Sequence, residues 1–85
     1  MKSFEEKLSD LAETFPSLRG LEGIRPFNPE ILRKNTYSSG QGAAVDFILN
    51  LYNSSHPFNL GKVIGNWDDH HQAAFAAWAK NPFWC

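Results

Sequence analysis

The sequence predicts a small all-α domain: a bundle of three main helices with one or two short helices and a packed irregular segment. Three stretches repeat apolar residues at helical spacing, capping residues precede the first and the last of them, and no stretch alternates polar and apolar residues over the length of a strand. The 85 residues are enough for one core but too few for two. We therefore expect residues 1–85 to form a single helical domain.

The first helix is predicted over residues 4–15. Ser3 is followed three positions later by Glu6, which is the pattern of a capping box at a helix start. The apolar residues that then recur at helical spacing are Phe4, Leu8, Leu11, Ala12 and Phe15. Pro16 ends the helix, because proline cannot continue its hydrogen bonding.

Residues 16–42 lack a clear period and are punctuated by proline and glycine, which predicts an irregular connection. The connection is too apolar for a flexible linker, since it contains Leu18, Leu21, Ile24, Phe27, Ile31 and Leu32. We expect one helical turn over residues 29–34, with Asn28 as its cap and Pro29 at its first position.

A second long helix is predicted over residues 41–53. Its apolar residues cover a wide face and comprise Ala44, Val45, Ile48, Leu49, Leu51 and Tyr52. Asp46 and Asn50 occupy the narrow remaining strip. A face of this width is typical of a central helix that packs on several sides.

The last third of the chain, residues 57–84, contains all three tryptophans and organises the domain. We expect Asn59 to cap a short helix over residues 60–64 that buries Leu60, Val63 and Ile64, and Gly65 to end it in the left-handed conformation. A longer helix should then start at Asn66, with Asp69 completing its capping pattern. Pro82 should stop this helix at Asn81.

The side chains that share one face of this last helix define a predicted core motif. Together with two residues upstream, the motif consists of Phe58, Leu60, Trp67, His71, Phe75 and Trp78. Phe83 and Trp84 lie beyond the helix, where they either return to the core or form a surface for a partner. The candidate partner-binding residues are Phe83, Trp84, His70 and Gln72.

The same region resembles a group of uncharacterised short bacterial and prophage-borne proteins. These share a C-terminal pattern of Phe-x-Leu, Trp-Asp-x-x-His, Ala-Phe-x-x-Trp and proline followed by aromatics. The matching positions here are Phe58, Leu60, Trp67, Asp68, His71, Ala74, Phe75, Trp78, Pro82, Phe83 and Trp84. The resemblance covers about the last third of the chain and implies a shared fold but no reaction. Gln72 stands where the group carries an arginine.

The charge balance disfavours nucleic acid as a partner. Eight basic and nine acidic residues give a net charge of −1, and no block of basic residues is present. The short helix, turn and longer helix near the C-terminus have the dimensions of a helix-turn-helix, so a small nucleic-acid-binding regulator remains the alternative. Asp68 and Asp69 at the start of the second helix would repel the DNA backbone.

We predict no metal, no cofactor and no catalytic residue, and therefore no enzyme. A metal site is suggested by the clustered ligand types His56, Asp68, Asp69, His70 and His71. However, adjacent residues on a helix point about 100° apart, so His70 and His71 cannot bind one ion. Cys85 is at the chain end, where it is poorly held for nucleophilic attack. Ser54, Ser55 and the other serines lie in no nucleophile-elbow sequence.

One cysteine precludes an internal disulfide, and no leader or membrane-spanning stretch can be read, so we expect a cytoplasmic protein. The surplus of aromatic side chains points to contact with a protein. The sequence thus predicts a small protein–protein interaction or accessory domain, which binds an unknown protein or itself and no membrane. The resemblance to prophage-borne proteins implies an origin in a mobile element.

Overall fold

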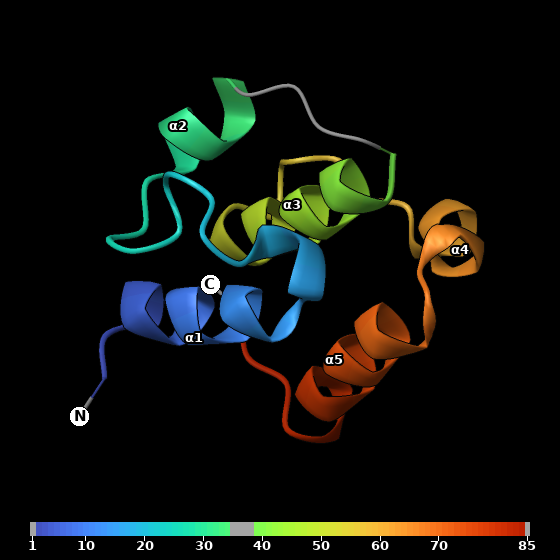
Figure 1. The fold of residues 1–85 in the computed structure, drawn as a ribbon. Coiled ribbons are helices and arrows are strands. Elements are labelled where there is room, and N and C mark those ends of the chain that lie inside the picture. The colour runs from blue at the N-terminus through green and yellow to red at the C-terminus, as the bar shows by residue number, and fades with distance from the viewer. Residues whose placement is uncertain (1, 35–38, 85) are drawn as a thin grey trace.

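A computed structural model describes residues 2–34 and 39–84 and confirms the all-α prediction (Figure 1). The α-helices in these ranges are α1 (Phe4–Thr14), α2 (Pro29–Lys34), α3 (Ser39–Tyr52), α4 (Leu60–Val63) and α5 (Asp69–Lys80). Two 3-10 turns accompany them, η1 (Pro16–Leu18) and η2 (Ile64–Asn66). The described residues contain no strand, and the principal extents of the molecule are 33 × 30 × 25 Å.

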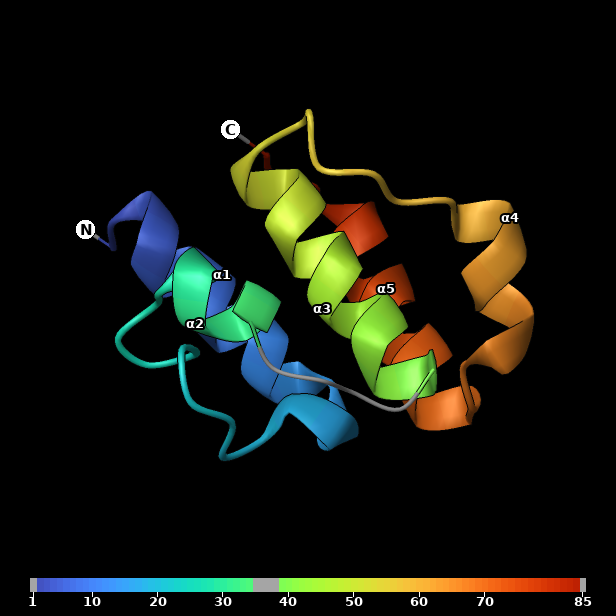
Figure 2. The ribbon, with the colours of Figure 1, turned by 90° about the horizontal axis from the view of Figure 1, so that it is seen from above.

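The central element is α3, as the wide apolar face predicted. Its buried residues are Ala43, Ala44, Val45, Phe47, Ile48, Leu49 and Leu51. In Figure 1, α1 and α5 lie on one side of α3 and α2 on the other. Figure 2 shows α4 at the far edge, away from α1 and α2. Most of the core is therefore built around α3.

α1 begins where its sequence predicts and ends one residue earlier. The Ser3 hydroxyl accepts a hydrogen bond from the Glu6 backbone N–H at 3.1 Å, and the Glu6 carboxylate accepts one from the Ser3 N–H at 3.3 Å. The helix ends at Thr14, with Phe15 as its C-terminal cap. Phe15 is completely buried and so extends the apolar face of α1 into the core.

The segment between α1 and α2 is irregular but closely tied to α1. The buried Ser9 hydroxyl donates to the Ile24 carbonyl at 2.5 Å. The Arg25 guanidinium pairs with Asp10 at 2.6 Å and with Glu13 at 2.8 Å. Leu18 and Ile24 are buried in the core, so the segment is packed, as its apolar residues led us to expect.

The predicted turn at residues 29–34 is confirmed as α2. The Asn28 side-chain oxygen accepts hydrogen bonds from the backbone N–H groups of Glu30 and Ile31, at 3.1 and 3.2 Å. Leu32 is completely buried and anchors α2 in the core.

The start of α5 differs from the prediction. Asp68, rather than Asn66, is the N-terminal cap, because its carboxylate accepts from the His71 N–H at 2.9 Å. Trp67 therefore precedes the helix, with an extended backbone that turns its ring inward, and it is 4 % exposed. Gly65 is also not left-handed. It continues the chain within η2, and positive φ occurs only at Gly20 and Gly23 among residues 2–34 and 39–84.

Two predicted core residues lie at the surface. Tyr52 and Ile64 are each 37 % exposed. Tyr52 is the last residue of α3, where the helix emerges from the core, and its ring lies 5.3 Å from the ring of Phe27, centroid to centroid. Ile64 lies at the junction of α4 and η2, and the two other apolar residues of this short helix, Leu60 and Val63, are half-buried.

Phe47 joins α3 to the rest of the aromatic core. Its ring lies 5.1–6.2 Å, centroid to centroid, from the rings of Phe15, Phe58, Trp67, Phe75 and Trp78. We call these six residues the aromatic cluster. The contacts to Phe75 and Trp78 show that α5 packs on α3 through large rings.

Within the described part of the chain, every helix is too short or too polar to cross a membrane.

Candidate functional site

An open groove of about 590 Å³ separates α1 from α5. It is lined by Lys7, Asp10, Leu11, Thr14, Ala74, Ala77, Trp78, Asn81, Pro82 and Phe83. Leu11 and Ala74 are buried and form its apolar floor, while Trp78 and Phe83 are half-buried. Polar side chains line the groove on the α1 side. The groove therefore offers an apolar surface with a charged rim.

The C-terminal segment is fixed beside this groove. The Trp78 indole N–H donates to the Phe83 carbonyl at 3.0 Å, and the Phe83 ring meets the edge of Phe4 at a centroid distance of 6.1 Å. Phe83 thus returns to the core, one of the two outcomes that the sequence left open. Trp84 does not return to the core and is 66 % exposed.

The other two candidate partner-binding residues lie far from these aromatics. His70 and Gln72 are exposed in the first turn of α5, and a helix of 12 residues separates its ends by about 18 Å. The Gln72 amide also donates to the carbonyls of Ile64 and Trp67, each at 3.0 Å. Gln72 therefore fixes the chain as it enters α5, and the four candidates do not form one surface.

The predicted core motif does come together. Trp67 and His71 are buried, and the remaining four residues, Phe58, Leu60, Phe75 and Trp78, are half-buried against the core. The Trp67 indole N–H has no hydrogen-bond partner among the described residues. Its ring is held by packing alone.

A hydrogen-bonded chain of three side chains links η1 to the start of α5. The Ser17 hydroxyl lies 2.7 Å from Nε2 of His71, and Nδ1 of the same ring lies 2.7 Å from the Asp68 carboxylate. His71 is only 9 % exposed, and its ring packs against Phe15 at a centroid distance of 5.8 Å. The order serine, histidine, aspartate is the connectivity of a nucleophile, a base and an orienting carboxylate.

The hydrogen bonds from His71 also change the acidity of Asp68. Both the ring and the backbone N–H of His71 donate to this carboxylate, and they hold the pKa of Asp68 below its ordinary value of 3.8. Asp68 is therefore ionised at neutral pH, when it accepts from the ring and caps the helix.

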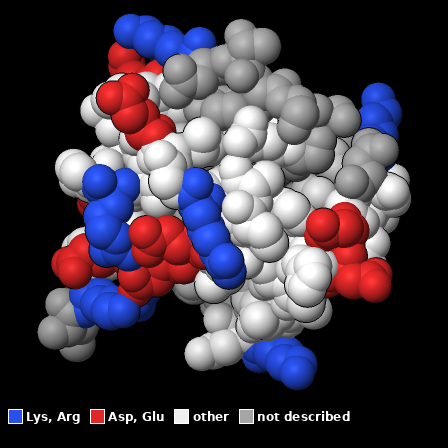
Figure 3. Space-filling view, in the orientation of Figure 1, with Lys and Arg blue, Asp and Glu red and all other residues white. Residues whose placement is uncertain are grey.

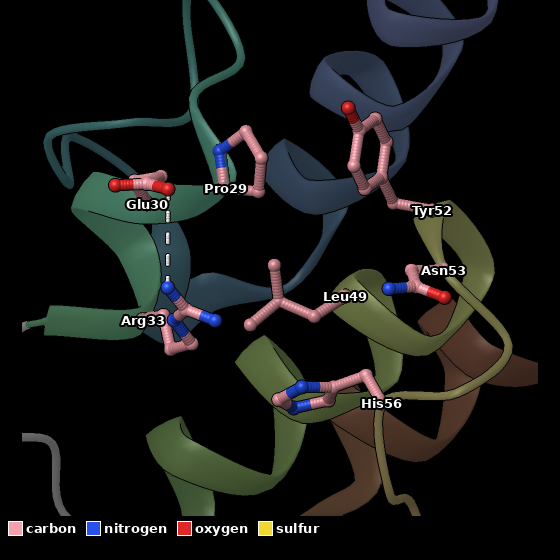
Figure 4. Close-up of a pocket in the computed structure, with 7 residues that line it drawn as sticks. All are labelled: Pro29, Glu30, Arg33, Leu49, Tyr52, Asn53 and His56. Carbon is pink, nitrogen blue, oxygen red and sulfur yellow. Dashed lines mark ion pairs between the residues drawn. The ribbon is translucent and has the colours of Figure 1, made fainter.

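A second hollow lies between α2 and the end of α3 and has a volume of about 350 Å³ (Figure 4). Its lining consists of Pro29, Glu30, Arg33, Leu49, Tyr52, Asn53 and His56. The charged side chains of Glu30 and Arg33 are more than half exposed and pair loosely at 3.9 Å. His56 is already paired with Asp46 at 2.9 Å. We assign no ligand to this hollow, because its charged groups are solvated or paired.

The histidines do not gather around one point. His56 pairs with Asp46, His71 pairs with Asp68, and His70 is exposed. Residues 2–34 and 39–84 contain no group of three His, Cys, Asp or Glu side chains that could hold a metal ion. Cys85 lies outside the described residues.

No protein-family profile matches this chain, and neither a curated protein nor a solved structure shows significant similarity to it. The resemblance to short prophage-borne proteins therefore stays a prediction.

Sequence reasoning missed Ser17 and Phe47. Ser17 is 54 residues from His71 along the chain, and no local motif marks it. Phe47 could have been found, because the apolar face of its helix is wide enough to include it.

Proposed function

We propose that this protein is a small protein-binding accessory domain, which accepts an amphipathic helix of its partner in the groove between α1 and α5. The observation that carries the proposal is the position of Trp84, which is 66 % exposed next to Phe83, a residue of the groove lining. A tryptophan side chain buries a large apolar area on binding and is enriched among residues that dominate binding energy.

The chemistry of the groove supports a helix as its occupant. An amphipathic helix presents apolar residues at intervals of three and four, which suit a floor made by Leu11 and Ala74. Lys7 and Asp10 supply both signs of charge at the rim. Figure 3 shows acidic and basic side chains interleaved over α1, so the polar face of the partner helix would meet a mixed charge pattern.

The nucleic-acid alternative has less support. In a helix-turn-helix, the start of α5 would approach the phosphate backbone, and this end carries Asp68 and Asp69. The exposed positions between His70 and Ala79 include no lysine or arginine. The Gln72 amide, the side chain best suited to read a base, is engaged by two backbone carbonyls.

Affinity capture with purified Trp84→Ala tests the proposal. We expect the substitution to remove a partner that the unaltered protein captures, and to leave the circular dichroism spectrum unchanged because Trp84 contributes little to the core. Ile64→Ala is the matched control, since it removes an exposed apolar side chain far from the groove and should retain the partner. Light scattering on both variants reports whether the partner is a second copy of the chain.

Equal capture by Trp84→Ala and the unaltered protein would contradict the proposal. Retention on heparin that falls steeply with salt would instead favour the nucleic-acid alternative.

A further inference from the structure

We infer that Ser17 is a nucleophile: His71 accepts its hydroxyl proton, Asp68 positions the imidazole, and small activated esters and fluorophosphonates modify the oxygen. This inference is independent of the proposed function, because none of the three residues lines the groove between α1 and α5. It departs from the sequence-based expectation that the chain has no catalytic residue.

The hydrogen bonds fix the direction in which the Ser17 proton moves. The ionised Asp68 carboxylate can only accept, so the proton between it and His71 belongs to Nδ1 of the ring. In the neutral ring Nε2 then carries a lone pair, and the Ser17 hydroxyl donates to it across 2.7 Å. This is the tautomer that a general base requires.

Packing holds the base and the nucleophile in place. The His71 ring is buried against Phe15, and both of its nitrogens are hydrogen-bonded. On the other side, the Gln41 amide donates to the Ser17 carbonyl at 2.7 Å and ties η1 to α3. Little reorganisation is needed before Ser17 can react, which is the condition for efficient attack.

The surroundings of Ser17 limit the class of substrate. Ser17 is half-buried, and neither the groove between α1 and α5 nor the hollow beside α2 includes it. Neither of these hollows would bind the acyl group of a substrate beside Ser17, so we expect a substrate that reacts through its own activated leaving group. Esters with a good leaving group, such as p-nitrophenyl acetate, and fluorophosphonates meet this requirement.

The reaction needs no other reagent. In attack on the ester, Ser17 Oγ forms a bond to the carbonyl carbon while the proton of the hydroxyl passes to His71 Nε2. The bond between that carbon and the aryl oxygen breaks, and p-nitrophenol leaves with the proton from His71. In attack on a fluorophosphonate, an oxygen–phosphorus bond forms, fluoride leaves, and the proton passes from His71 to water.

Labelling with a fluorophosphonate, followed by mass spectrometry of peptides, tests the inference. Ser55 is the internal control, because it is exposed and no hydrogen bond joins its hydroxyl to a histidine within residues 2–34 and 39–84. A general base accelerates such reactions by about 100-fold or more, so we expect Ser17 to be labelled about 100 times faster than Ser55. Ser17→Ala should remove the adduct, and Ser55→Ala should leave it.

Asp68→Asn tests whether Asp68 orients the His71 ring, without unfolding α5. Asparagine caps helices as well as aspartate does, so α5 should persist by circular dichroism. Its amide can present an N–H to the ring and favour the wrong tautomer, so labelling of Ser17 should slow by about tenfold or more. If the three side chains only joined η1 to α5 and did not activate Ser17, Asp68→Asn would not slow the labelling.

Labelling of Ser17 no faster than that of Ser55 in the unaltered protein would overturn the inference, and this result needs no variant to fold. Equal labelling rates in Asp68→Asn and the unaltered protein would overturn the role of Asp68. Capture of a partner through Trp84 is measured separately, so either proposal can fail without the other.

Discussion

The aromatic cluster around Phe47 and the segment between α1 and α2 are held by different forces. In the cluster, ring faces and edges pack within 5.1–6.2 Å of Phe47, and burial of apolar area stabilises the contact between α3 and α5. The segment between α1 and α2 also buries Leu18 and Ile24 in the core, but specific hydrogen bonds and ion pairs, such as those of Ser9 and Arg25, fix its path beside α1. A cluster can tolerate small shifts in ring position, whereas a segment held by hydrogen bonds depends on exact backbone geometry.

The largest expected effect comes from the cluster. Phe47→Ala removes a ring that is 2 % exposed and contacts five others, so we expect a loss of about 3–5 kcal/mol in the free energy of unfolding. Phe27→Ala is the matched control in the irregular segment, because Phe27 is half-buried and contacts only the Tyr52 ring among the ring pairs of the described residues. Urea unfolding should show the smaller loss for Phe27→Ala, and equal losses would remove the distinction between the two regions.

The second prediction tests the backbone geometry of the segment. Gly23 has φ +91°, and a Cβ there would lie 3.0 Å from the Asn28 carbonyl oxygen and 3.1 Å from the Leu32 backbone nitrogen. Gly23→Ala should therefore lower the free energy of unfolding by about 2 kcal/mol or more, since left-handed strain and crowding against backbone add. Gly20 has φ +80° and open space around it, so Gly20→Ala measures the cost of the left-handed backbone without crowding.

Gly20→Ala should cost only about 1 kcal/mol. If the two glycine variants unfold at the same urea concentration, the close approach at Gly23 does not limit the packing of α2.

The smallest effect is on the pH dependence of stability. Hydrogen bonds from Lys2 and Arg25 hold the pKa of Asp10 below its ordinary value of 3.8. Because the unfolded chain binds this proton more readily, the stabilisation is complete above that value and is lost as the pH falls below it. We expect the urea midpoint to decrease between pH 5 and pH 3 in the unaltered protein.

Asp10→Asn should make this acid-induced decrease smaller, because the ion pairs with Lys2 and Arg25 are then absent at every pH. The same decrease in Asp10→Asn as in the unaltered protein would show that the pairs do not anchor the segment.

Features that depend on neighbouring residues were predicted correctly, whereas a feature that depends on tertiary packing was not. The capping box of Ser3 and Glu6 and the cap at Asn28 were predictable because each depends on residues within three positions of one another. The start of α5 was mispredicted although Asn66 and Asp68 are both suitable caps. The choice between them follows from the buried position of Trp67, which requires an extended backbone immediately before the helix.

The candidate sites were only partly accessible from the sequence. The excess of aromatic residues near the C-terminus pointed to Phe83 and Trp84, but not to the groove, which exists only where α1 lies beside α5. The separation of Ser17 from its base by 54 residues hid the hydrogen-bonded chain altogether.

The sequence by itself determined that the chain forms an all-α fold and where α1, α2 and α3 lie to within about two residues. It also determined most of the apolar residues that α3 buries, namely Ala44, Val45, Ile48, Leu49 and Leu51. These features follow from the spacing of residues along the chain. Only the tertiary structure decided that Phe83 returns to the core while Trp84 stays exposed, and that Ser17 meets His71. Such outcomes depend on how distant segments compete for the same core space, and that competition is settled only when the helices pack.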